Sequence, residues 1–423
     1  MEPVDLEAVW WLHPGKLLLF FVVPLYLFMT YLVPVAWPNV VVLRAYPYLQ
    51  GEYAAMGLVA LLLAGSGAIL GSRIEFSRNP VVLYEVNERF MIVIGLITLM
   101  AYLIWFGPML VTGNTSLERD ELNRIPGVTS FTQFGVTFAV CYMYAALRAR
   151  QQLSRVVVIL FCVLLVFTLA RVYIWMERLA MIELGIPTAI SILAYVRPRR
   201  PFVRKLFKIV SDYGPFLGIP LLLAFFTATE VVRSWTTYSQ TLNVSLSEFV
   251  VSRVTTYYYT ALNNGAGLLA TTHWPTYKFE YVAAWFYALP MGIGHYFADV
   301  MGIHENPAEV FLSRYADVEF NNMSGIFTII YDVGYYGGIL YFSGFGLAAG
   351  ILYRGVRMGR PYGILFFPSM MVACFEIMRI DYINGARYVL IAVSAGLAIT
   401  QMQPKREKTA RSPGRRSITV VQT

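Results

Sequence analysis

The sequence predicts an all-α, polytopic integral membrane protein with about ten transmembrane helices and one large extracytoplasmic loop. Hydrophobic residues make up 57% of the 423 residues and charged residues only 14%, whereas about 25% of a typical soluble domain is charged. Apolar runs of about 20 residues, the length that crosses a bilayer core, recur along the chain. Lysine and arginine gather in alternate connections, which is typical of cytoplasmic loops.

The apolar runs predict ten membrane spans. We expect the first span to remain in the mature protein, because it is too long for a signal peptide and lacks a small-residue cleavage motif. The sixth span is unusual in containing Glu177, Arg178 and Glu183, and the tenth is short. The predicted spans are residues 17–36, 53–71, 91–112, 129–147, 154–170, 172–196, 214–231, 325–352, 363–378 and 388–402.

The basic residues predict the orientation. Most of the 33 lysines and arginines lie on one side of the ten-span arrangement, so both termini are expected in the cytoplasm. This anchoring explains the net charge of +8, and we expect no nucleic-acid partner. The basic groups are Lys16; Arg73, Arg78 and Arg89; Arg148, Arg150 and Arg155; Arg197, Arg199, Arg200, Arg204, Lys205 and Lys208; Arg354, Arg357 and Arg360; and the tail KREKTARSPGRR.

Four regions follow from this layout. Transmembrane helices 1–7 are expected in residues 1–231, and the large outer loop with its amphipathic helices in residues 232–324. Transmembrane helices 8–10 are expected in residues 325–403, and residues 404–423 form a basic cytoplasmic tail. All three cysteines, Cys141, Cys162 and Cys374, fall inside predicted spans. We therefore expect them to be small core residues, with no disulfide in the outer loop. No Cys/His spacing resembles a metal site, and we expect no metal and no cofactor.

The outer loop is rich in aromatic residues, unlike a disordered linker. It holds Trp235, Trp274, Trp285 and a run of tyrosines that includes Tyr258. We expect short amphipathic helices on the membrane surface, with rings at the level of the lipid headgroups. Two interpretations stay open for these rings: they anchor the loop at the interface, or a few of them, such as Tyr258, stack on sugar rings.

Arginines on the outer face run against the positive-inside trend. A guanidinium binds diphosphate oxygens through two parallel hydrogen bonds and keeps its charge, so several such arginines suit a lipid-diphosphate substrate. The alternative is an ion pair with Glu177, Glu183, Glu376 or Asp381. We favour substrate binding for Arg171, Arg253, Arg314 and Arg387, with Arg178 as a further candidate, and an ion pair for Arg233 and Arg379.

The most informative stretch runs from Arg314 to Gly350. Ten residues separate Arg314 from Gly325, and Asn321 and Asn322 lie between them. Then Asp332, Gly334 and Gly337 form D-x-G-x-x-G. A carboxylate in a membrane segment is a functional candidate by default, although Asp332 could instead cap a bent span. We expect the glycines of this motif, with Gly338, to permit close helix packing.

The segment FNNMSGIFTIIYDVGYYGG, together with the span layout, resembles the bacterial oligosaccharide repeat-unit polymerases (O-antigen polymerases, Wzy-type). The resemblance implies an enzyme of the bacterial cytoplasmic (inner) membrane that joins undecaprenyl-diphosphate-linked repeat units at the outer face. Besides membrane lipids, the partners to consider are a chain-length regulator and a flippase. It implies catalytic roles for Arg314 and for a general base among Asp332, Glu319 and His295. Substrate-binding candidates are Arg171, Arg178, Arg253, Arg387, Asn321, Asn322 and Tyr258.

Other functions stay open. An O-antigen ligase shares this architecture and uses an outer-loop histidine, and His273, His295 and His304 all lie in the outer loop. A GT-C-type glycosyltransferase places an acidic pair in its first outer loop, where this chain offers only Glu52. A transporter or flippase for lipid-linked sugar commonly shows a repeat of spans, which we do not find. A purely structural membrane protein is the remaining alternative.

Overall fold

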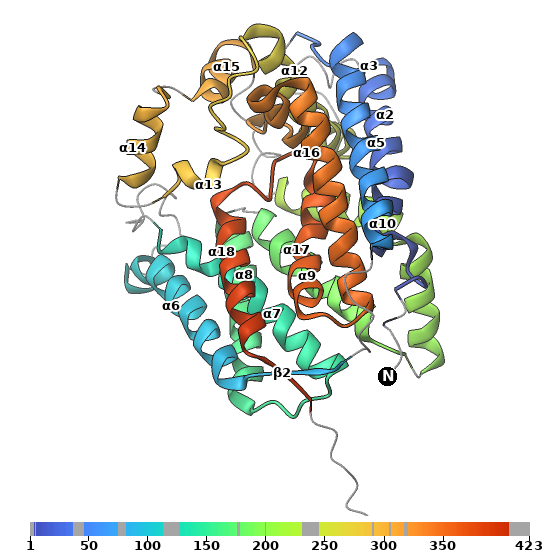
Figure 1. The fold of residues 1–423 in the computed structure, drawn as a ribbon, viewed down its shortest axis with the longest axis vertical. Coiled ribbons are helices and arrows are strands. Elements are labelled where there is room, and N and C mark those ends of the chain that lie inside the picture. The colour runs from blue at the N-terminus through green and yellow to red at the C-terminus, as the bar shows by residue number, and fades with distance from the viewer. Residues whose placement is uncertain are drawn as a thin grey trace, which may run out of the picture.

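The computed structural model is mostly helical and is shown in Figure 1. Its helices form an elongated bundle, and many of them run roughly along the long axis of the molecule. The structure describes residue 4 and residues 6–36, 46–74, 82–112, 127–175, 178–198, 200–230, 245–289, 292–303, 306–316 and 320–405.

The first predicted span is one helix interrupted by two π turns. Each turn precedes a proline, Pro24 or Pro34, whose missing N–H removes a helical hydrogen bond. In chain order the elements are η1 (Trp10–Leu12), α1 (Pro14–Leu17), η2 (Leu18–Val22), α2 (Val23–Leu27), η3 (Phe28–Leu32), α3 (Val33–Ala36), α5 (Gly51–Arg73), β1 (Tyr84–Val86), α6 (Glu88–Thr112), η4 (Thr129–Gln133), α7 (Phe134–Met143), η5 (Tyr144–Arg148), α8 (Arg155–Trp175), α9 (Arg178–Tyr195), α10 (Pro201–Glu230), α12 (Leu246–Thr271), α13 (Ala284–Tyr287), α14 (Ile293–Val300), α15 (Pro307–Tyr315), α16 (Gly325–Arg357), α17 (Pro361–Glu376), α18 (Ala386–Thr400) and β2 (Met402–Pro404).

Six helical segments in the described part of the chain are long and apolar enough to cross a membrane. They are Pro14–Ala36, Gly51–Arg73, Glu88–Gly107, Thr129–Arg148, Arg155–Ile174 and Gly325–Arg357. Each overlaps a predicted span, so an all-α membrane protein is supported. The predicted spans 172–196, 363–378 and 388–402 coincide with shorter apolar helices, Leu179–Tyr195, Pro361–Glu376 and Ala386–Thr400. The span predicted at 214–231 forms the second half of α10.

Small residues bring α5 and α16 into close contact. A Cβ added at Gly346 would overlap the carbonyl oxygen of Ala64, and one added at Gly350 would overlap that of Ala68. On the facing helix, a Cβ at Gly67 would lie 2.5 Å from the carbonyl oxygen of Ser343. The spacing of four residues keeps these positions on one face of each helix, as in small-xxx-small interfaces of membrane proteins.

A kink divides α16 at Gly334, whose φ of 76° and ψ of 175° are not helical. Only glycine adopts this backbone conformation without strain. Gly334 packs against the ring of Pro275, and the nearest side-chain neighbours of Gly337 and Gly338 are Val333 and Ile330 of their own helix. The expectation that this motif permits helix–helix packing was therefore wrong, because Gly346 and Gly350 fill that role.

The connections that we expect in the cytoplasm meet at the lower end of the molecule in Figure 1. Strands β1 and β2 pair antiparallel, with Glu85 opposite Gln403. This sheet is an exception to the all-α prediction. Lys405 donates through Nζ to the carbonyl oxygen of Ala149 (2.8 Å), which joins a third connection. Arg357 forms an ion pair of 2.8 Å with Glu7. Several basic connections therefore do share one side.

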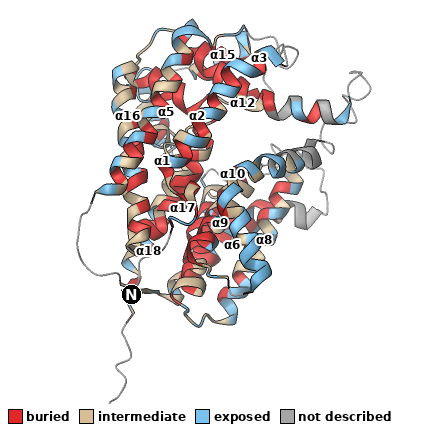
Figure 2. Ribbon diagram, turned by 90° about the vertical axis from the view of Figure 1, so that its right-hand side faces the viewer, coloured by how far each residue is buried: buried red, intermediate tan, exposed pale blue. Residues whose placement is uncertain are grey.

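The predicted outer loop contains α12, α13, α14 and α15. The last three helices are short, as expected, but α12 has 26 residues and is buried along much of its length (Figure 2). The expectation that the loop lies on the membrane surface was wrong for this helix. The reason is a buried polar contact: Asn263 accepts hydrogen bonds from the backbone N–H groups of Tyr48 (2.8 Å) and Leu49 (3.0 Å).

The three cysteines are free thiols. Cys141 and Cys374 are buried, as expected for core residues, but Cys162 is exposed. Cys162 belongs to α8, a candidate span, where we expect an exposed side chain to face lipid rather than a neighbouring helix. The prediction of a core residue was therefore wrong at this position.

Candidate functional site

Four helical elements bring polar side chains together where α8 ends and where α7, α9 and α18 begin. The site uses the last turns of α8, the beginning of α9, the short helix η4 that precedes α7, and the first turn of α18. The opposite ends of α7 and α18 lead to the connections around the β1–β2 sheet. The site therefore lies at the end of these helices away from the expected cytoplasmic connections. We name it the arginine site and define it as Thr132, Gln133, Arg171, Glu183 and Arg387.

Arg171 is the innermost cation of the arginine site. Its side chain belongs to a residue that is only 2% exposed. Its Nη1 donates to the hydroxyl of Thr132 (3.4 Å), and its Cζ lies 4.5 Å from the ring centroid of Trp105. A desolvated guanidinium over an indole face gains a cation–π interaction worth about 2 kcal/mol. The Trp105 ring and the Thr132 hydroxyl therefore fix the position of the Arg171 guanidinium.

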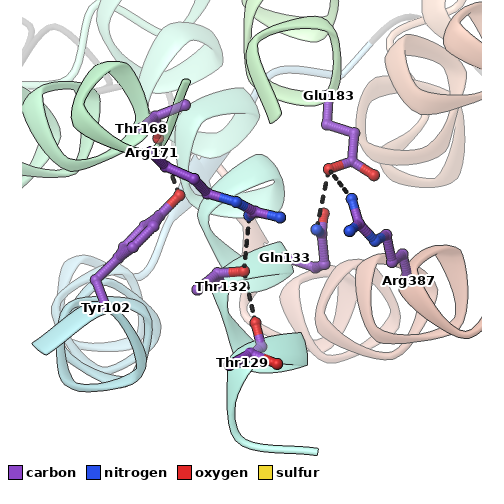
Figure 3. Close-up of polar contacts among 8 residues, drawn as sticks. All are labelled: Tyr102, Thr129, Thr132, Gln133, Thr168, Arg171, Glu183 and Arg387. Carbon is purple, nitrogen blue, oxygen red and sulfur yellow. Dashed lines mark hydrogen bonds and ion pairs between the residues drawn. The ribbon is translucent and has the colours of Figure 1, made fainter. Parts of the chain in front are cut away.

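Glu183 connects its own helix, α9, to η4 and to α18. Its Oε2 accepts from Gln133 Nε2 (3.0 Å) and forms an ion pair with Arg387 Nη1 (3.5 Å), as Figure 3 shows. Glu183 is 2% exposed, whereas the Arg387 side chain is 36% exposed. The other carboxylate oxygen, Oε1, is buried and has no hydrogen-bond partner among the residues that the structure describes. A buried carboxylate oxygen without a partner is costly, so it is a place where a ligand hydroxyl could donate.

A small polar cavity joins these groups. Its volume is about 20 Å³, which is room for about one water molecule. Arg171 and Glu183 contribute charged groups to the wall, and Thr98, Tyr102, Thr132 and Thr168 contribute hydroxyls. Tyr102 and Thr168 are hydrogen-bonded to each other (3.1 Å). In Figure 3, Arg171 and Arg387 lie on either side of the Thr132–Gln133 segment. The cavity thus gathers donors of the kind that bind phosphate or sugar oxygens.

The structure explains Asp332 as an anchor of the outer segment. Asp332 is fully buried and lies two residues before the kink at Gly334. Its Oδ1 accepts from the backbone N–H of Glu280 (3.1 Å), and its Oδ2 from those of Tyr281 (2.6 Å) and Val282 (2.8 Å). The carboxylate therefore caps the turn that begins at residue 280, which is one of the two roles that the sequence left open.

Two further carboxyl groups lie close to this anchor. Burial and the neighbouring Asp332 carboxylate raise the pKa of Glu280 to about 7, although Lys278 acts in the opposite direction. Burial also raises the pKa of Asp381 to about 7, while hydrogen bonds from Asn384 oppose the shift. Carboxyl groups that titrate near neutral pH are suited to general acid–base chemistry. The sequence interpretation named neither of them as a base.

Arg379 forms the ion pair that the sequence predicted. Its Nε donates to Glu376 Oε2 (2.5 Å), and both side chains are buried. Its Nη1 donates to the hydroxyl of Tyr257 on α12 (2.7 Å). The ion-pair interpretation of Arg379 is therefore confirmed. Arg387 also forms an ion pair, with Glu183, although the sequence interpretation favoured substrate binding for it.

The remaining predicted residues lie apart from the arginine site. Arg314 is exposed at the end of α15, and Figures 1 and 2 place α15 near the upper end of the molecule, away from α8 and α9. His295 and Asn321 are exposed, while Tyr258 is half-buried on α12. Asn322 accepts, through its carbonyl oxygen, a hydrogen bond from Asn264 (3.2 Å). The structure does not bring these residues together with Arg171.

Several predictions concern residues that the structure leaves undescribed. Glu319, Arg233 and His304 lie outside the described residues. Arg178 and Arg253 belong to α9 and α12, but their side chains are also outside the described part. Within the described residues, no group of three His, Cys, Asp or Glu side chains is placed to hold a metal ion.

Sequence reasoning missed how much of the site is uncharged. Gln133, Thr132 and Trp105 carry no signal in the sequence, because single polar or aromatic residues are common near helix ends. Glu183 did carry one: it is an acidic residue inside a predicted span, which is costly unless it is paired. The sequence interpretation considered Glu183 only as an ion-pair partner for an arginine.

Comparisons with protein-family models, with curated proteins and with solved structures give no match. The function is therefore argued from the arginine site and from the residues of the sequence itself.

Proposed function

We propose that this chain is a membrane glycosyltransferase that joins lipid-diphosphate-linked oligosaccharide repeat units into a surface polysaccharide. The observation that supports this most is the arginine site, where the buried Arg171 lines a polar cavity and Arg387 pairs with Glu183, another residue of the cavity wall. Guanidinium groups match the oxygens of a diphosphate. The site lies at the end opposite the basic connections, which is the face where a lipid-linked donor would present its diphosphate.

The proposed reaction is a displacement at the anomeric carbon of the donor sugar. A hydroxyl oxygen of the acceptor forms the new bond to this carbon, and the bond from the carbon to the diphosphate oxygen breaks. The lipid diphosphate leaves with the electron pair, and Arg171 and Arg387 stabilise the negative charge that develops on it. The cavity has room for about one water molecule, so binding a diphosphate requires displacement of the side chains that close it.

The proton of the acceptor hydroxyl needs a base. Asp332 was the first candidate from the sequence, but three backbone N–H groups occupy its oxygens. We assign the role to Asp381, which precedes Arg387 in the connection between α17 and α18. Its carboxylate accepts hydrogen bonds from the side chain and the backbone of Asn384, that from Nδ2 to Oδ2 being 2.8 Å long. Asp381 also lines a second cavity next to the first turn of α16. Its pKa of about 7 suits proton transfer at neutral pH.

The test is an assay of purified protein with a lipid-linked oligosaccharide, read as a ladder of polymer. We expect Arg171→Ala to reduce the rate roughly 100-fold or more, as does removal of a preorganised donor from a charge-stabilising site. Arg171→Lys keeps the charge but loses the planar fork, so it should restore only part of the rate. The matched control is Arg89→Ala, which removes an exposed arginine at the other end of the molecule.

The outcomes separate the functions that remain open. Melting temperature and gel-filtration profile show whether each variant is folded. A folded Arg171→Ala protein with the wild-type rate would contradict the proposal. Transfer of a single glycan to a different acceptor would indicate a ligase, and lipid flipping in vesicles without transfer would indicate a transporter.

A further inference from the structure

The first half of α10, Pro201–Gly214, carries three different surfaces around one helix. One surface packs on the N-terminal segment, a second is apolar and exposed, and a third is basic and exposed. Residues three or four positions apart share a face of a helix, which sorts the side chains into these surfaces. This pattern is typical neither of a helix on the surface of a soluble protein nor of a membrane-spanning helix.

The packed surface rests on two tryptophans. Trp10 Nε1 donates to the carbonyl oxygen of Asp212 (2.9 Å), and Trp11 Nε1 donates to that of Val210 (3.0 Å). Gly214 permits this approach, because a Cβ there would lie 2.6 Å from the Trp11 ring. Tryptophan is enriched at membrane–water interfaces, and these two indoles fix α10 to the segment that precedes the first span.

The apolar surface is exposed along four turns. Phe202 is 77% exposed, Leu206 51%, Ile209 40%, Tyr213 59% and Phe216 51%. The spacing of four, three, four and three residues keeps them in one stripe. An exposed stripe of large apolar side chains at this length is a contact surface for lipid or for another apolar partner.

The basic surface lies on the same turns. Arg204, Lys205 and Lys208 are all exposed, and they alternate along the chain with the apolar stripe. A lysine or arginine at the centre of a bilayer is energetically costly. This part of α10 is therefore excluded from the hydrocarbon core, although its stripe is too apolar for water.

We propose that Pro201–Gly214 lies in the membrane interface and binds the headgroups of anionic glycerophospholipids through Arg204, Lys205 and Lys208. The apolar stripe enters the boundary between headgroups and acyl chains, as in other interfacial amphipathic helices. The positive charge of these three side chains favours anionic lipid headgroups as the ligand, because basic residues near an anionic membrane surface are attracted to it. The site belongs to the leaflet on the side of the N-terminal segment.

Native mass spectrometry of the full-length protein in detergent tests this site with phosphatidylglycerol and phosphatidylcholine as probes. We expect wild-type protein to bind phosphatidylglycerol more tightly. Arg204→Ala/Lys205→Ala/Lys208→Ala should weaken phosphatidylglycerol binding roughly tenfold or more and leave phosphatidylcholine binding unchanged. The matched control, Arg73→Ala/Arg89→Ala/Arg155→Ala, removes the same charge from three exposed arginines elsewhere and should change binding less than about threefold.

A charge-conserving variant tests whether the alanine substitutions weaken lipid binding by removing charge or by disturbing α10. Arg204→Lys/Lys205→Arg/Lys208→Arg should retain the preference for phosphatidylglycerol, which would support recognition of charge at this helix. Equal losses in the two alanine variants would overturn the proposal, because the attraction would then be spread over the whole face. Equal affinity of wild-type protein for both lipids would overturn it as well.

Discussion

At the scale of single residues, the contacts of Asp332 support a structural role for a carboxylate that the sequence motif had made a catalytic candidate. The carboxylate accepts three backbone hydrogen bonds from residues 280–282, and the backbone carbonyl of Asp332 accepts another from Tyr277 (2.8 Å). Hydrogen bonds to a charged group are each worth about 1.5–3 kcal/mol. One side chain therefore fixes the outer segment against the kink of α16.

Asp332→Asn tests this anchor. Asparagine offers one acceptor oxygen and directs an NH₂ group at the remaining backbone donors, so the turn should loosen. We expect the amides of residues 280–282 to exchange hydrogen at least about tenfold faster, since one lost charged hydrogen bond corresponds to about that factor. Hydrogen exchange followed by mass spectrometry of the peptide provides the measurement.

The same variant distinguishes an anchor from a base. If amide protection is unchanged while transfer activity disappears, Asp332 acts as the base and the anchor interpretation is wrong. Asp381→Asn is the comparison, because it removes the base that we propose without removing any of the three backbone contacts of Asp332.

At the scale of elements, the contact between α5 and α16 organises the bundle. Glycine and alanine on both helices allow the backbones to approach closely, which increases dispersion contacts where lipid offers no hydrophobic driving force. The kink at Gly334 then separates the two parts of α16. The part before the kink is almost entirely buried and carries Asp332, while the part after it packs on α5.

Gly346→Leu tests this packing. The new side chain would overlap the carbonyl of Ala64, and overpacking of this kind costs about 1–3 kcal/mol or more. We expect a clearly lower melting temperature, measured by fluorescence-detected size-exclusion chromatography. Gly344→Leu is the control. Gly344 lies on the same helix, and apart from the nearby backbone of that helix no atom of the described residues lies within 4 Å of an added Cβ. This substitution should leave the melting temperature nearly unchanged.

At the scale of the whole molecule, the two ends of the bundle differ in chemistry. One end gathers the β1–β2 sheet, Lys405 and the Arg357–Glu7 ion pair. The arginine site lies at the opposite ends of α7 and α18, and the helices α13, α14 and α15 lie farther from the sheet (Figure 1). The separation of basic connections from the proposed site is what the positive-inside rule expects of an enzyme that works at the outer face.

Cysteine labelling tests which end faces the cytoplasm. In a background without the three native cysteines, Ser313→Cys on α15 should react with a membrane-impermeant maleimide in intact cells. Arg89→Cys, at the beginning of α6, should react only after the membrane is permeabilised. Both positions are exposed, so burial does not limit either reaction. The reverse pattern would invert the predicted orientation.

The sequence by itself determined the class of protein and the positions of most helices. Composition and apolar run length are local properties, and they identified segments that overlap all six long apolar helices. The clustering of basic residues also indicated which connections share an end. The small sheet escaped this reasoning, because Tyr84–Val86 and Met402–Pro404 are far apart in the chain and each has only three residues.

Only the tertiary structure decided which polar residues meet. Arg171, Glu183 and Arg387 were each visible as charged residues near helix ends. The cavity that Arg171 and Glu183 line, and the ion pair between Glu183 and Arg387, depend on how α8, α9 and α18 pack. Arg314, marked by its motif, lies elsewhere on α15. Contacts between distant segments are set by the packing of whole helices. Burial then decides whether a charged side chain is solvated, forms a buried ion pair or is available to bind substrate.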